Sequence, residues 1–145
     1  MSSLIIDVQD RQEIESLIYN HAWIQDNNDT EQLAELYLKD GRLHGIGPDR
    51  KGRAAIAEFG RKRHTPPDRI ARHVCTNVRL TPLGDGRIKG HLYITLYRHV
   101  GGDLGPADPC ALADAHDVYA RDEKGQWKFS ERRLELIFES ESHKN

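Results

Sequence analysis

The chain has 145 residues, of which 37% are hydrophobic and 30% charged, so it suits one globular domain with a single core rather than a disordered chain. Its net charge of −2 gives no electrostatic reason to expect nucleic acid as a partner. We see no apolar run long enough to span a bilayer, and no basic-then-apolar secretion signal at the N-terminus. Cys75 and Cys110 lie far apart and suggest neither a disulfide scaffold nor a metal motif. We therefore expect a single domain over residues 1–145, in a reducing cytoplasm.

The N-terminal half is expected to be mainly helical. Residues 7–28 carry a stripe of apolar side chains at helical spacing, which predicts an amphipathic helix. The stripe consists of Ile14, Leu17, Ile18, Ala22 and Trp23. A second, short helix is expected to start at Asp29, with Gln32 placed for a capping-box contact. Gly52 precedes a third amphipathic helix over residues 53–59, whose end is basic, as the C-terminal end of a helix favours.

The rest of the chain is expected to form strands. A short strand is predicted between the second and third helices, and four longer ones follow after glycine-rich or proline-rich turns. The predicted strands are 41–47, 70–82, 87–100, 111–121 and 126–138. Several of them are semi-apolar on both faces, which suggests that a partner subunit covers the outer face of the sheet. This order of elements predicts an α+β fold, with helices on one side of a curved, mostly antiparallel sheet.

Asp26 and His73 are the first two candidates for functional residues. Asp26 lies beside the buried stripe near the end of the first helix, where burial and the helix dipole both disfavour a negative charge. It either pairs with a buried group or caps the next turn and meets water. His73 is either a base that lines a cavity or an ordinary surface histidine, depending on which face of its strand is buried.

Other polar residues allow weaker predictions. Asn77 would share the strand face of His73, where it could bind a substrate oxygen or satisfy a buried backbone group. Tyr97 would line a cavity only if its face of strand 87–100 is the inner one. His91, His99 and His116 lack the carboxylate–histidine spacing of a metal motif, so no metal site is predicted.

Six segments, taken in order and spacing, resemble the SnoaL-like branch of the NTF2-like superfamily. They are DRQEI at 10–14, DNND at 26–29, LAELY at 33–37, KGRAAI at 51–56, RHVCTNV at 72–78 and GQWKFSERR at 125–133. The resemblance implies a cone-shaped barrel, in which three N-terminal helices close a deep apolar pocket against the curved sheet. It also implies a homo-oligomer formed through the outer face of the sheet, with a homotrimer preferred over a homodimer.

Within that branch, HVCTNVRL at 73–80 and QWKF at 126–129 look most like hexachlorocyclohexane dehydrochlorinase and, more distantly, scytalone dehydratase. Asp26 and His73 match the helix-borne and strand-borne members of a catalytic dyad. His21 matches a basic residue five positions before that aspartate. Arg132 matches an arginine of the last strand, with Arg133 as the alternative if the register is shifted by one.

This resemblance implies a cofactor-independent lyase that acts on a small, largely apolar alicyclic or aromatic molecule. His73 would be the base and Asp26 its orienting partner, because a buried carboxylate fixes the imidazole tautomer, stabilises its charge and raises its pKa. His21, in a protonated form, and Arg132 would assist the leaving group, and Tyr19 is a further candidate proton donor to it. The expected substrate-binding residues are Tyr19, Trp23, Asn77 and Tyr97. A proton-shuttling isomerase, a polyketide-type cyclase and a non-catalytic small-molecule-binding module remain open alternatives.

Overall fold

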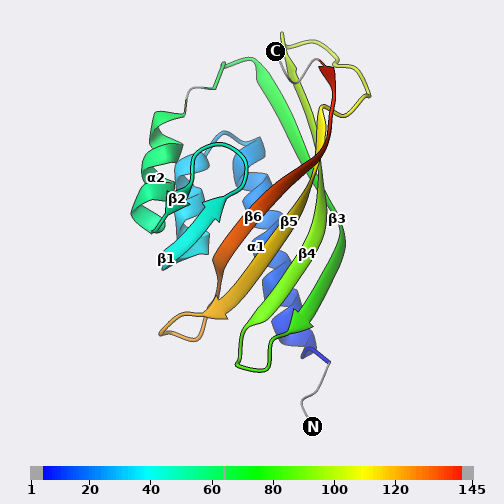
Figure 1. Cartoon of the computed structure of the whole chain (residues 1–145). Coiled ribbons are helices and arrows are strands. Elements are labelled where there is room, and N and C mark those ends of the chain that lie inside the picture. Colours follow the sequence, from blue (N-terminus) through cyan, green and yellow to red (C-terminus); the bar gives the residue numbers. More distant parts are fainter. Residues whose placement is uncertain (1–4, 64, 142–145) are drawn as a thin grey trace.

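Six strands form one sheet, and the helices pack against one side of it (Figure 1). The computed structural model describes residues 5–63 and 65–141. Its elements are α1 (Val8–Asp26), the 3₁₀ helix η1 (Thr30–Leu36), β1 (Tyr37–His44), β2 (Arg50–Lys51), α2 (Arg53–Lys62), β3 (Arg69–Pro82), β4 (Ile88–Val100), β5 (Ala111–Arg121) and β6 (Trp127–Glu139). The α+β prediction, with three helices on a mostly antiparallel sheet, is confirmed.

The strands run in the order β2-β1-β6-β5-β4-β3, so β2 and β3 are edges and the cone is open rather than closed. β1 and β6 are parallel, whereas the other neighbouring strands are antiparallel. The parallel pair joins the N-terminal half of the chain to the last strand, with Leu43 opposite Arg132. This pairing places Arg132 beside the helices. β2 is a two-residue strand that the sequence analysis did not predict.

The first helix follows its predicted stripe with one exception. Asp7 caps α1 by accepting a hydrogen bond from the backbone N–H of Gln9 at 2.8 Å. Ile14, Leu17, Ile18 and Ala22 are buried as predicted. Trp23 is instead 69% exposed, so its predicted burial is wrong. Trp23 is five residues after Ile18, which at 3.6 residues per turn places it about 140° around the helix.

The second helix is a 3₁₀ turn rather than an α-helix. Asp29 makes no side-chain capping hydrogen bond, so the predicted capping box with Gln32 is wrong. β1 begins directly after the turn, at the fully buried Tyr37, several residues earlier than predicted. The backbone of Asn28 adopts φ 61°, a left-handed conformation that asparagine tolerates, and this reverses the chain after α1.

A β-bulge divides β3 and changes which side chains point inward. Asn77 adopts φ 55°, and the pairing with β4 shifts register between Thr76 and Arg79. His73 and Cys75 before the bulge and Val78 after it are partly buried, whereas Asn77 is exposed. The prediction that His73 and Asn77 share one face is therefore wrong, because the inserted residue interrupts the two-residue period.

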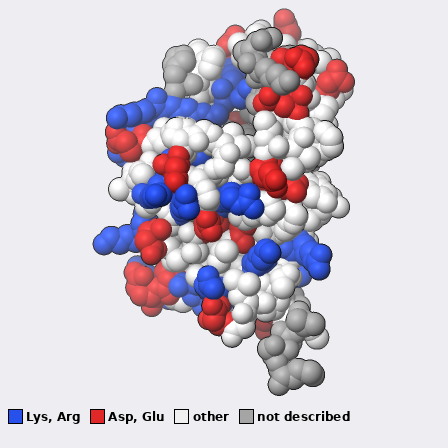
Figure 2. Space-filling model, in the orientation of Figure 1, with Lys and Arg blue, Asp and Glu red and all other residues white. Residues whose placement is uncertain are grey.

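The core lies between α1, η1 and the inner face of the sheet. Its fully buried members include Ile14, Ile18, Tyr37, Leu92, Ala115, Tyr119 and Phe129. Acidic and basic side chains are intermixed over the face shown in Figure 2. Neither α-helix within residues 5–63 and 65–141 combines the length and hydropathy that a bilayer crossing requires.

Candidate active site

Asp26 and His73 form a close pair between α1 and β3. Asp26 is the last residue of α1, and its Oδ1 lies 2.6 Å from His73 Nδ1. The same carboxylate accepts the backbone N–H of His73, at 3.0 Å for Oδ1 and 3.2 Å for Oδ2. Their side chains are only 11% and 16% exposed. The negative charge at the unfavourable end of a helix dipole is therefore offset by three short contacts with one residue.

This contact defines the tautomer of His73. An ionised carboxylate can only accept, so Nδ1 carries the proton that it donates to Asp26. In the neutral ring the lone pair is then on Nε2. No residue within 5–63 or 65–141 hydrogen-bonds to Nε2, and His73 lines the internal cavity. The geometry leaves a basic nitrogen available to a molecule bound there.

Burial lowers the pKa of His73, and this effect outweighs the hydrogen bond and charge of Asp26, which raise it. The positive charges of Arg63 and Arg132 lower the pKa further. The sequence analysis expected a raised pKa, because it considered the carboxylate and not the loss of solvent. With the lowered pKa, the imidazole is neutral at pH 7, which is the form that can accept a proton.

A buried ion pair lies beside the dyad. Arg132 donates from Nε to Asp117 Oδ1 and from Nη2 to Oδ2, both at 2.8 Å, and Tyr119 donates its hydroxyl to the same Oδ2 at 2.6 Å. Both charged side chains are at most 1% exposed. Burial opposes the charge of Arg132, but Asp117 outweighs burial and raises the pKa of the guanidinium. Arg132, rather than Arg133, lines the cavity, and its Nη1 makes no hydrogen bond with the described residues.

His21 is buried and neutral. Its Nε2 lies 3.0 Å from the Tyr37 hydroxyl and its Nδ1 lies 3.2 Å from Gln25 Oε1. Burial, followed by the charge of Arg132, lowers the pKa of His21 well below its ordinary value. This direction disfavours the protonated His21 that the sequence analysis expected, because a second positive charge beside Arg132 is unfavourable there. His21 nevertheless lines the cavity and can position a ligand as a neutral group.

The cavity has a volume of about 340 Å³ and is mostly apolar. Its apolar wall is formed by η1, α2 and the inner face of the sheet, through Leu33, Leu43, Ile56, Phe59, Ile94, Leu96, Ala111, Ala113, Leu134 and Leu136. The guanidinium of Arg50 donates hydrogen bonds to the backbone carbonyls of Leu43 and Ile46 and lies over the Phe59 ring. Arg63, Arg98 and the carboxylate of Glu139 also line the cavity.

The four predicted substrate-binding residues all lie outside this cavity. Tyr19 is 50% exposed and Trp23 69% exposed on the outer side of α1. Asn77 is exposed at the bulge. Tyr97 alternates with the cavity-lining Leu96 and Arg98, so it lies on the outer face of β4. The single chain gives none of these four a place against a bound ligand, because each points away from the helix–sheet interior.

Sequence analysis missed several residues that line the cavity or support it. Asp117 lies at an inner position of β5 that is otherwise occupied by alanine and tyrosine, so it signalled a buried partner. Arg98 continues the inner face of Leu92, Ile94 and Leu96 in the same way. Arg63, at the C-terminal cap of α2, belonged to a run that was interpreted as a solvent-exposed helix end. Cys75 packs against the core and burial raises the pKa of its thiol, which favours a packing role over a nucleophile.

A family model described as a SnoaL-like domain matches residues 7–133 of this chain. The chain belongs to the SnoaL-like domain family. The match includes both members of the dyad, the buried ion pair and most residues of the cavity wall. The predicted family and its NTF2-like fold are thus confirmed. No curated protein matches this SnoaL-like domain.

Solved structures support the same fold. An NTF2-like protein with a cystatin-like fold from Novosphingobium aromaticivorans is 26% identical, with a TM-score of 0.74 over 94% of this chain and 88% of its own. A scytalone dehydratase-like protein from the same organism is 16% identical, with a TM-score of 0.72 over 92% and 87%. LinA is 22% identical, with a TM-score of 0.72 over 90% and 88%. At 16% and 22% identity, the last two likenesses establish the fold alone.

Proposed function

We propose that this SnoaL-like domain is a lyase that eliminates water or halide from a small, largely apolar ring without an organic cofactor. The observation that carries the proposal is the 2.6 Å contact between Asp26 and His73, with Nε2 of the imidazole left available at an apolar cavity. A binding module would need no such pair of acid and base. Elimination is preferred to other proton transfers because residues 73–80 and 126–129 resemble dehydrochlorinase and dehydratase sequences.

In this mechanism, His73 Nε2 removes a proton from carbon, and the electrons of that C–H bond form the new double bond. The leaving group departs with the electrons of its own bond. Asp26 stabilises the imidazolium that forms and holds the ring in place. Arg132 Nη1, which has no partner among the described residues, donates to the departing oxygen or halide. General base catalysis of this kind contributes about 10²- to 10⁴-fold.

The cavity also indicates the kind of substrate. Its aliphatic wall suits one alicyclic or aromatic ring, and its volume of about 340 Å³ is small for a ligand site. Arg63 and Arg98 add two guanidinium charges to a cavity wall whose lining includes one carboxylate, Glu139. We therefore favour a ring that bears an acidic or oxygen-rich substituent, since such a group would pair with these guanidiniums.

Turnover of a panel of cyclic alcohols and halides tests the proposal, with released halide or dehydrated product as the readout. His73→Gln and Asp26→Asn should each lower kcat/KM by about 10²-fold or more. His44→Gln is the matched control, because His44 also bonds a carboxylate, Glu131 at 2.6 Å, but does not line the cavity. Full activity in His73→Gln would contradict the proposal. A product of unchanged mass would indicate an isomerase with the same dyad.

We also propose that copies of the chain associate through the outer face of the sheet, as a homotrimer. Val74, Tyr93 and Phe138 on this face are 43%, 40% and 67% exposed in the single chain, which is unfavourable in water. Sedimentation equilibrium of the wild type and of Phe138→Glu would test this association. A monomeric wild type would contradict it.

A further inference from the structure

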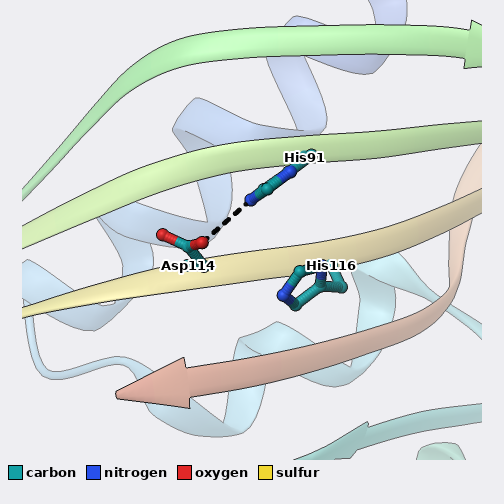
Figure 3. Close-up of side chains that lie close together, drawn as sticks. All are labelled: His91, Asp114 and His116. Carbon is teal, nitrogen blue, oxygen red and sulfur yellow. Dashed lines mark hydrogen bonds and ion pairs between the residues drawn. The ribbon is translucent and has the colours of Figure 1, made fainter. Parts of the chain in front are cut away.

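Two histidines and an aspartate meet on the outer face of the sheet, opposite the cavity (Figure 3). His91 of β4 is the register partner of His116 of β5, and Asp114 precedes His116 by two residues on the same face. His91 Nε2 lies 3.0 Å from Asp114 Oδ2, and the two imidazole rings are 4.6 Å apart between centroids. One possible ligand atom from each residue lies within 4.8 Å of the other two.

These three side chains have the chemistry and nearly the spacing of a metal site. Zn²⁺ binds imidazole nitrogen and carboxylate oxygen at about 2.0–2.2 Å, so two ligands of a tetrahedral ion lie about 3.4 Å apart. The 3.0 Å separation between His91 Nε2 and Asp114 Oδ2 and the 4.8 Å limit for the three ligand atoms lie on either side of this value. In the single chain all three residues are only partly buried, so an ion can reach them from solvent before copies associate through this face. Two histidines and one carboxylate also suit other divalent transition metals.

Glu135 gives the cluster the support that metal ligands need. Its Oε1 lies 3.0 Å from Nε2 of His116, so this carboxylate can accept the N–H of that ring and leave Nδ1 to bind an ion. A metal-binding histidine almost always donates its other ring N–H to such a group. Asp114 and Glu135 together supply two negative charges, which exceed the single positive charge of Arg133, the β6 register partner of His116.

We propose that His91, Asp114 and His116 bind one Zn²⁺ ion, with Glu135 orienting His116. Three protein ligands leave the fourth tetrahedral position for water or for a donor from another molecule. The sequence analysis predicted no metal, because the ligands come from two strands and their register cannot be read from spacing. His99, which it grouped with His91 and His116, is not part of the cluster. The site faces away from His73, so it does not depend on the proposed lyase activity.

Calorimetric titration of the untagged, chelator-treated chain with ZnCl₂ tests the site. The wild type is expected to bind one ion per chain. His91→Asn and Asp114→Asn should weaken binding more than about tenfold, and Glu135→Gln about 10- to 100-fold. His99→Asn is the matched control, since His99 lies on the same strand and face, and it should bind as the wild type does. Absence of binding, or equal binding in all variants, would overturn the proposal.

A second measurement needs only the wild type, in case a variant fails to fold. Long-range ¹H–¹⁵N spectra with assigned imidazoles should show that Zn²⁺ shifts the ring nitrogens of His91 and His116. Shifts confined to His73 or to another histidine would overturn the assignment, because the ion would then bind elsewhere. Turnover by the zinc-free protein is expected to be unchanged, so the two proposals can fail separately.

Discussion

Replacing Asp117 with asparagine should destabilise the fold strongly. The substitution keeps the shape of the side chain but removes the negative charge that neutralises Arg132. Both side chains are at most 1% exposed, and the carboxylate accepts two hydrogen bonds from Arg132 and one from Tyr119. An amide has only one acceptor oxygen, so one of these donors loses its acceptor. Removing one partner of such a pair costs about 3–5 kcal/mol, because the other charge is left buried and uncompensated.

Urea unfolding followed by circular dichroism measures this loss. The free energy of unfolding of a domain of this size is about 5–15 kcal/mol, so the variant should lose roughly a fifth or more of its stability. Asp49→Asn is the matched control. Asp49 also accepts two bonds from one arginine, Arg42, at 3.0 and 2.7 Å, but this pair is exposed to solvent and its loss should change the midpoint much less.

Equal shifts of the midpoint in the two variants would contradict a dominant effect of the buried charge. Asp117→Leu combined with Arg132→Met should also be more stable than Asp117→Asn alone. The double replacement leaves no buried charge, and apolar substitutes for buried ion pairs are often neutral. A double variant that is less stable than the single one would show that shape at this position matters more than charge.

Three further predictions concern the site. NMR titration should give His73 a pKa below its ordinary value, and Asp26→Asn should lower it further; a rise would contradict the assigned hydrogen bond. Because burial lowers the pKa of His21, the unfolded chain takes up a proton there first, so stability should fall by up to about 1.4 kcal/mol per pH unit below pH 6.5. Urea unfolding at several pH values should show this slope reduced in His21→Gln. Arg63→Gln and Arg98→Gln should weaken calorimetric binding of benzoate about tenfold while leaving toluene binding unchanged; equal losses would exclude charge recognition.

The sequence predicted those features that depend on periodicity. The buried stripe of α1 and the extent of β5 follow from the pattern of apolar residues, which recur with periods of 3.6 and 2 residues. Burial and strand alternation singled out Asp26 and His73, family resemblance paired them, and the structure places them 2.6 Å apart. Trp23 was predicted to be buried, but it lies about 140° around the helix from Ile18 and is exposed.

Other features depend on long-range pairing or on a single irregular residue. The bulge at Asn77 changes which residues of β3 point inward, and the alternation of apolar and polar residues around it does not predict this change. The partner of Asp117 lies on another strand, so its position signals only that some partner exists. The lowered pKa of His73 follows from burial, which requires the complete fold. The cluster of His91, Asp114 and His116 likewise appears only once the register between β4 and β5 is known.

The small side chains of β5 have an implication for engineering. Ala111 and Ala113 line the cavity from a central strand, and Ala115 follows them on the same inner face. The cavity therefore lies where the side chains of β5 are small. The backbone of this central strand is fixed by hydrogen bonds to a neighbouring strand on each side. Replacing Ala113 with valine and then isoleucine should narrow the range of ring sizes that the cavity can bind, while Asp26 and His73 stay in place. The size of the cavity can thus be changed on β5, separately from the charged side chains that other elements contribute to it.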